Sequence, residues 1–252
     1  RPGKWRMTNV KRKMGAMRPR TEALLLVGVW CAVAALAVTL GILYPSPTQD
    51  TMCRYAVMAE NFAAGNWFEA FHPRFCVLYP VLTGLTLKLT GMNSLFVCCA
   101  VAMVGWSLGV FPLFRIARNV FGSACAWFAV GLYVVCPQLI FWGFQGLREP
   151  WRVFALLMMV AGLFEPRERR GTAFLELLVG VMISVTLRVD AIAAAGLFIL
   201  AYFAVERFSW RSWLVCLWGV LWVQPCCYLT YVWTGLWIPG PPFAPLFRSW
   251  LS

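Results

Sequence analysis

The sequence predicts an all-α fold, a polytopic transmembrane helical bundle of about seven membrane-spanning helices. The composition is one reason, since 61% of the residues are hydrophobic and only 13% are charged. A soluble domain is typically near half apolar and about a quarter charged. The second reason is that apolar segments of helical length recur along the chain, with short polar stretches between them.

A basic tail, residues 1–22, precedes the first apolar segment. Eight of the 22 Lys and Arg residues lie in residues 1–20, with no acidic residue among them. Such a tail suits the anionic inner leaflet of a membrane and the excess of Lys and Arg in cytoplasmic segments. The net charge of +12 therefore indicates membrane orientation and not nucleic-acid binding. We expect a cytoplasmic N-terminus and one transmembrane domain over residues 23–252.

The first span is expected at 23–43. Its apolar run is too long for a signal peptide and no cleavage site is clear, so we expect it to be retained. Two short helices should follow in the first outer loop, at 50–64 and 75–89, and lie in the membrane interface. Asp50 or Thr48 would cap the first of them, and Gly65 would end it.

The remaining spans are expected at 94–114, 123–141, 150–164, 172–187, 191–205 and 212–233. Alternate loops between them are rich in arginine. Together with the tail, these loops place 15 of the 22 basic residues on one side. The positive-inside rule makes that side cytoplasmic. The other seven basic residues map to the opposite face, where several stand beside an acid.

The ten cysteines predict neither a disulfide framework nor a zinc site. No CxxC motif and no zinc-type Cys/His spacing is present. Cys53 and Cys76 share the first outer loop, so a disulfide between them stays open.

Three acid/base groups fall on the expected outer face, and two further basic residues join them from the first loop. The groups are Asp50 with Arg54, Arg148 with Glu149, and Arg188 with Asp190, joined by His72 and Arg74. They are distant in sequence but share one membrane side, so they could meet in one cavity.

Transfer of a sugar from a lipid phosphate would use such a set. It needs a base for the acceptor hydroxyl, for which Asp50 is the candidate. It needs cations for the leaving phosphate, which arginine binds bidentately. The candidates for this contact are Arg54, Arg74, Arg148 and Arg188. A second carboxylate, Glu149, could hold a divalent metal ion or orient the donor.

Each of these residues also has a structural interpretation. Asp50 could cap the first interfacial helix, and Glu149 could cap the span that begins at Pro150. Asp190 could cap the following span while Arg188 extends toward the headgroups. His72 is a lone loop histidine. Glu176, inside an expected span, could face a cavity or pair with a neighbouring helix.

The order of features resembles the glycosyltransferase C superfamily, with the dolichyl-phosphate-mannose/aminoarabinose transferase type as the nearest branch. The resemblance covers about residues 40–225 and depends on the order of motifs. After a first span come Asp50, Tyr55, Ala59 and the Gly65-Asn66-Trp67 turn, then His72-Pro73-Arg74, Leu78-Tyr79-Pro80 and Gly91. Arg115–Gly122 resembles the family's cytoplasmic turn, Glu149 matches an acid of the second outer loop, and Leu187-Arg188 matches an LxR pattern followed by Asp190.

The resemblance implies an inverting transfer from a polyprenyl-phosphate-linked sugar to a glycan, lipid or protein acceptor. The reaction would occur on the periplasmic or lumenal side, and we expect a bacterial inner (plasma) membrane protein. The chain departs from the family where Thr51 follows Asp50, where Arg74 replaces a common Lys, and where Glu149 replaces Asp. Members usually have more spans and often a soluble domain, so we expect an N-terminal part of a longer protein.

Two alternatives stay open. A transporter or flippase component for lipid-linked glycans would place paired charges and broken helices near the bilayer midplane. Apart from Glu176, the charges here cluster at one membrane edge, which favours the enzyme. An O-antigen polymerase or ligase would be expected to use long outer loops late in the chain.

Overall fold

The structure is a computed structural model of the chain. It describes residues 19–71, 77–166, 169–188, 191–206, 210–211, 213–219 and 221. Every regular element in these residues is a helix and none is a strand, which confirms the predicted all-α class. Residues 1–18 of the predicted basic tail and most of the span expected at 212–233 lie outside the described residues, and the last four residues of the tail belong to the first helix.

Twelve helical elements follow one another between residues 19 and 206, and the described residues from 210 to 221 are also helical. They are α1 (Pro19–Leu43), the π-helical turn η1 (Thr51–Tyr55), α2 (Ala56–Ala64), α3 (Trp67–Ala70), α4 (Leu78–Thr90), α5 (Ser94–Leu108), α6 (Val110–Phe121), α7 (Ser123–Val134), α8 (Pro137–Phe144), α9 (Glu149–Phe164), α10 (Arg170–Leu187) and α11 (Ala191–Glu206).

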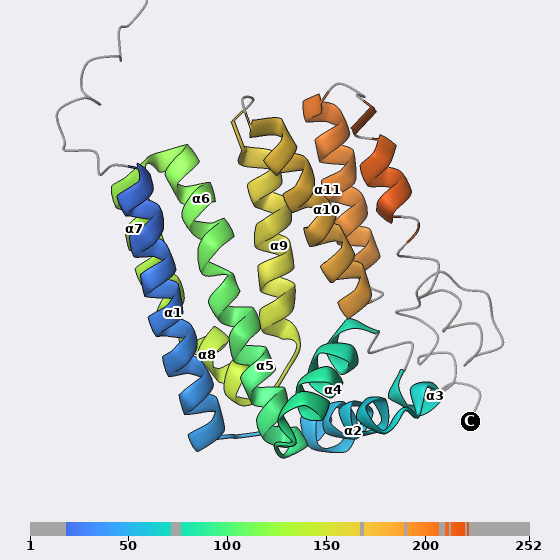
Figure 1. The fold of residues 1–252 in the computed structure, drawn as a ribbon. Coiled ribbons are helices and arrows are strands. Elements are labelled where there is room, and N and C mark those ends of the chain that lie inside the picture. The colour runs from blue at the N-terminus through green and yellow to red at the C-terminus, as the bar shows by residue number, and fades with distance from the viewer. Residues whose placement is uncertain are drawn as a thin grey trace, which may run out of the picture.

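The long helices run side by side, and the helices of the first loop lie across one end of them (Figure 1). We call this the capped end, formed by η1, α2, α3 and α4 with the starts of α5 and α9. The opposite end holds the start of α1, the α6–α7 turn and the α9–α10 connection, and we call it the arginine end. The two sets of loops that alternate in the sequence therefore lie at opposite ends of the bundle.

Several helices have the length and composition of membrane spans. Among the described residues, three segments qualify by themselves, and the bent pair α7–α8 could form a fourth; the three are Arg20–Leu43, Ser94–Phe121 and Arg170–Leu187. Helices α9 and α11 have only 16 residues each. The apolar helices suit a membrane protein, as the composition predicts.

The second expected span is longer than predicted. We expected it at 94–114, but the helical segment continues through Phe121 with one interruption at Gly109. Pro112 explains the interruption, because it has no N–H to donate to the carbonyl of Leu108. The Tyr133 hydroxyl donates a 2.8 Å hydrogen bond to the carbonyl of Trp106 at this point. Arg115 therefore lies on a helix and not in a loop.

The third expected span, 123–141, is not one straight helix. It consists of α7 and α8, which are bent by 45° relative to each other. Cys136 precedes Pro137 and has extended backbone angles, φ −65° and ψ 110°. A residue before proline is disfavoured in the helical conformation, and proline is well suited to the first turn of a new helix. The predicted helix ends at Gly65 and Gly91 are confirmed, since both glycines end helices with positive φ.

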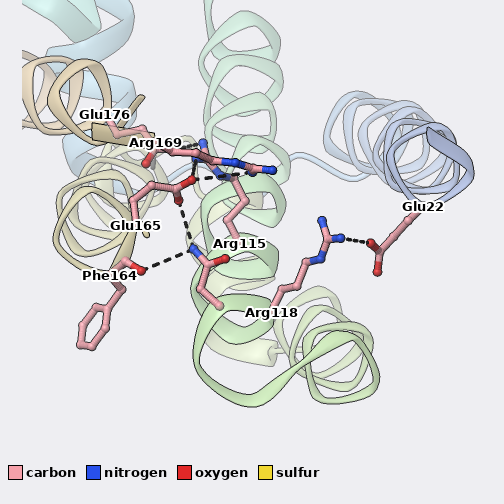
Figure 2. A network of polar contacts seen from close by, with 8 residues as sticks. Glu22, Arg115, Arg118, Phe164, Glu165, Arg169 and Glu176 are labelled. Atoms are coloured by element: carbon pink, nitrogen blue, oxygen red, sulfur yellow. Dashed lines mark hydrogen bonds and ion pairs between the residues drawn. The ribbon is translucent and has the colours of Figure 1, made fainter. Parts of the chain in front are cut away.

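Ion pairs between buried carboxylates and partly exposed arginines connect distant segments at the arginine end (Figure 2). Arg118 of α6 lies 2.8 Å from Glu22 of α1, which also accepts a hydrogen bond from Ser123 of α7. Arg115 of α6 lies 2.8 Å from Glu165, which follows α9, and also pairs with Glu176 of α10. Helix α6 thus holds α1 and α7 on one side and α9 and α10 on the other.

The Arg115–Glu176 pair answers the question that the sequence left open for Glu176. Its carboxylate is 5% exposed and pairs with a neighbouring helix. Glu176 lies about 9 Å of helix from the start of α10, inside an apolar segment. A charge there is costly unless it has a partner, so removing one member of the pair should destabilise the bundle by about 3–5 kcal/mol.

The first prediction compares the two members of this pair. Arg115→Met leaves Glu176 without its cation and Glu165 with only the more distant Arg169 at 3.8 Å, whereas Glu176→Met leaves Arg115 paired with Glu165. We expect Arg115→Met to lower the unfolding midpoint more than Glu176→Met. Adding Glu176→Met to Arg115→Met should restore part of the loss, because it removes one unpaired charge. The midpoint is measured on detergent-solubilised protein.

Arg20→Gln is the matched control, because Arg20 is exposed at the same end. It should change stability by no more than about 0.5 kcal/mol. Strictly additive losses in the double variant would contradict the coupling of Arg115 and Glu176.

Candidate functional site at the capped end

The predicted site begins with Asp50 and the π-helical turn η1. The wide turn is closed by the N–H of Ala56, which donates to the carbonyl of Thr51. Turns of this type are rare and often occur at functional sites. The hydroxyl of Thr48 accepts a 3.3 Å hydrogen bond from the N–H of Thr51, while Asp50 makes no capping bond. Capping therefore falls to Thr48.

Asp50 instead forms an ion pair with Arg54. Its Oδ1 lies 3.1 Å from Nη1 of Arg54, and the two side chains are 53% and 46% exposed. The pair is one helical turn apart and open to solvent, so its own contribution to stability is small. Both groups are accessible to a charged ligand.

The turn between α8 and α9 ties the first loop to the rest of the bundle. The Thr51 hydroxyl donates to the carbonyl of Gln145 at 2.5 Å. The Tyr79 hydroxyl lies 2.7 Å from the carbonyl of Gly146 and 2.9 Å from that of Cys98. Gly146 has φ +68°, and a Cβ on it would lie 2.8 Å from Cγ2 of Thr51. Only glycine fits this close approach without strain.

This turn places the start of α9 beside η1. Arg148 is 3% exposed, and its Nη1 donates a 3.0 Å hydrogen bond to the carbonyl of Leu187 at the end of α10. Its Cζ lies 5.8 Å from the ring centroid of Tyr55, within the range of a cation–π contact. One buried guanidinium thus joins α9, η1 and the end of α10. Burial and backbone bonding suit Arg148 to positioning these segments more than to binding a substrate phosphate.

Tyr55 is influenced by the charged residues of this end. Its pKa is raised to about 12, mainly by burial, and Arg148 opposes the rise. Glu149 and Asp50 also act to raise this pKa, and Arg188 acts to lower it. Four of the predicted site residues, from three distant segments, therefore act electrostatically on one tyrosine: Asp50, Arg148, Glu149 and Arg188.

Glu149 differs from the other charged residues of the site. It lies in the first turn of α9, and the residue at the cap position is Arg148, which makes no capping hydrogen bond. Oε2 of Glu149 is buried and has no hydrogen-bond partner among the described residues. Oε1 of Glu165 and Oε2 of Glu176 are also buried without a hydrogen-bond partner, but those two carboxylates form ion pairs with Arg115, whereas Glu149 forms none among the described residues. A buried carboxylate oxygen without a partner is unusual in a folded protein and calls for an explanation.

Other predicted site residues lie outside the described residues: His72, Arg74 and Asp190. Cys53 is a free, exposed thiol, and Cys76 also lies outside the described residues. In the part of the chain that the structure describes, no three His, Cys, Asp or Glu side chains are grouped to hold a metal ion.

Several neutral residues of the site were not predicted as such. They are Thr51 and Tyr79, which bond the α8–α9 turn, Gly146 within that turn, and Tyr55. The sequence signal for Gly146 is a glycine two residues before the charged pair Arg148-Glu149 and its following proline. The chain matches no family model, no curated protein and no solved structure.

The second prediction concerns the contact between Gly146 and Thr51. Gly146→Ala combines a left-handed backbone, which costs about 1–2 kcal/mol, with a collision against Thr51 Cγ2. We expect a lower unfolding midpoint than for Gly65→Ala, whose glycine has φ +85° but open space around it.

Thr51→Ser removes Cγ2 and keeps the hydroxyl that bonds Gln145. It should therefore restore part of the stability of Gly146→Ala. Equal midpoints for the Gly146 and Gly65 variants would contradict the close approach.

Proposed function

We propose that this protein is a membrane glycosyltransferase that moves a sugar from a polyprenyl-phosphate-linked donor to an acceptor. The observation that supports this is that Asp50, Arg148, Glu149 and Arg188, from three distant segments, all act electrostatically on Tyr55 at the capped end, where Arg148 also contacts its ring. It gives one location two carboxylates and several arginines, the groups that proton removal and phosphate departure require. The acceptor would be a glycan, a lipid or a protein.

The arginines differ in exposure, and we assign the more exposed ones to donor binding and the buried one to a structural role. Arg54 is half-exposed and Arg188 partly buried, so they are candidates for the donor phosphate. Arg148 is buried and holds the segments together. From the sequence pattern, His72, Arg74 and Asp190 remain candidates for donor binding. Arginines can stabilise the leaving phosphate by charge, so the proposal requires no metal ion.

We also propose seven spans in a bacterial inner (plasma) membrane, with the N-terminus and the arginine end in the cytoplasm. The distribution of basic residues supports this orientation. The first-loop helices would then lie in the outer interface. Trp67 is 58% exposed, and its ring lies 4.8 Å from that of Phe62, as suits aromatic anchors at headgroup level.

The third prediction tests this orientation with a native thiol. Cys53 is exposed on η1 beside Arg54. In a Cys76→Ser background, a membrane-impermeant maleimide added to intact cells should label Cys53, and Cys53→Ser should abolish that label. Labelling that requires permeabilised cells would contradict an outer location of the capped end. In the unmodified chain, labelling only after reduction would indicate a Cys53–Cys76 disulfide.

A transporter or flippase component for lipid-linked glycans is the second candidate. The observations in its favour are the interrupted α5–α6 segment and the Arg115–Glu176 pair inside the bundle. A transporter moves the donor across the membrane without cleaving it, so product analysis separates the two functions.

The fourth prediction is the direct test of transfer. Full-length protein in liposomes should transfer label from at least one of a panel of radiolabelled undecaprenyl-phosphate hexoses and pentoses to an added acceptor extract. Arg188→Gln and Arg54→Gln should each lower the rate by roughly ten- to a hundredfold, the value of a lost charge-assisted contact of about 1.5–3 kcal/mol. Arg20→Gln, at the far end, should leave it unchanged. Donor movement without cleavage would favour the transporter.

A further inference from the structure

Two carboxylates of the capped end differ in what their oxygens contact. Asp50 holds the guanidinium of Arg54 at 3.1 Å and is half-exposed. Glu149 has one buried oxygen, Oε2, that no described residue bonds. A third carboxylate at this end, Glu60, already accepts a 2.5 Å hydrogen bond from the hydroxyl of Ser94.

An ionised carboxylate only accepts hydrogen bonds, so the missing partner of Oε2 must be a donor. Leaving such an oxygen buried and unpaired costs free energy, so it calls for an explanation, and a ligand that donates a hydrogen bond is one. An acceptor hydroxyl is a donor of the required type. A base must also have an oxygen free to take the proton, and at Asp50 one of the two oxygens, Oδ1, already holds the Arg54 guanidinium.

We infer that Glu149, and not Asp50, is the general base of the transfer; this inference rests on the proposed function. Oε2 takes the proton of the acceptor hydroxyl as the acceptor oxygen attacks the anomeric carbon of the donor. The new carbon–oxygen bond forms while the bond from that carbon to the phosphate oxygen breaks. The electron pair leaves with the polyprenyl phosphate, next to Arg188 and Arg54, and the proton remains on Glu149 until water removes it.

The fold holds Glu149 more firmly than Asp50. Glu149 begins α9 directly after Arg148, whose guanidinium is fixed to the carbonyl of Leu187. The preceding turn is bonded by Thr51 and Tyr79. A base is effective when such neighbours fix its position. Asp50 is then a positioning residue that directs Arg54 toward the donor phosphate.

The fifth prediction separates the two carboxylates by kinetics. In the liposome assay, Glu149→Gln should lower kcat by roughly a hundredfold or more with the donor KM unchanged, the usual effect of losing a general base. Glu149→Asp should retain a measurable part of kcat. Asp50→Asn should raise the donor KM and lower kcat by less than roughly tenfold, because it loosens Arg54. Cys53 labelling and the unfolding midpoint report whether each variant folds.

Rescue by azide distinguishes a general base from a residue that only supports the structure. Azide has no proton to remove, so it can attack the anomeric carbon without a base and give a glycosyl azide and free polyprenyl phosphate. Added azide should restore donor cleavage in Glu149→Gln but not in Arg188→Gln. If Glu149→Gln fails to fold, the kcat loss and azide response of Glu149→Asp decide the question in the same way.

The possible failures are distinguishable. If the unmodified protein transfers sugar, Asp50→Asn abolishes kcat and Glu149→Gln retains it, the base assignment is overturned and the proposed function stands. If the unmodified protein transfers label from no donor of the panel, the proposed function is overturned, and the base assignment with it.

Discussion

The hydrogen bond from the Tyr79 hydroxyl to the carbonyl of Gly146, with its neighbour from Thr51 to Gln145, decides how the capped end is assembled. Buried carbonyls must find donors, and at this turn the chain supplies them from η1 and α4. In return, the two bonds fix the distance between the first loop and the start of α9. The contact of Arg148 with Tyr55 and the position of Glu149 both depend on that distance.

The two ends of the bundle use the same residue types for different purposes. At the arginine end, the carboxylates of Glu22, Glu165 and Glu176 are buried and each faces an arginine. Such pairs specify which helices meet and leave little charge free for a ligand. At the capped end, Asp50 and Arg54 are open to solvent, and Glu149 forms no ion pair among the described residues. The two ends differ in how their charged side chains are exposed and paired, and not in composition.

Sequence patterns predict the elements whose cause is local. The lengths of the apolar segments predict the ends of α1, α10 and α11 to within a few residues. Glycines mark the ends of α2 and α4. The bend at Pro137 was missed, although proline is also a local signal. The continuation of the second span through α6 was not predicted, because Arg115 and Arg118 were taken to mark a loop. Arg115 stays on the helix because Glu165 and Glu176 reach it from distant segments, which a single sequence does not reveal.

For the site, the alternation of spans is enough to place Asp50, Glu149 and Arg188 on one face. It says nothing about which carboxylate is already paired, because that depends on three-dimensional neighbours. The contact of Tyr55 with Arg148 is hidden for the same reason, since an uncharged residue gives no charge pattern.

The interruptions in the long helices bear on the choice between transferase and transporter. A transporter directs unwound backbone groups toward its substrate near the bilayer midplane. Here the carbonyl of Trp106, at the α5–α6 interruption, accepts hydrogen bonds from the Tyr133 hydroxyl and from the N–H of Gly109. This carbonyl is satisfied inside the bundle and is not free to bind an ion or a sugar. The accessible charges at the capped end are then the ones left for chemistry, which favours transfer at the membrane surface over passage through the bundle.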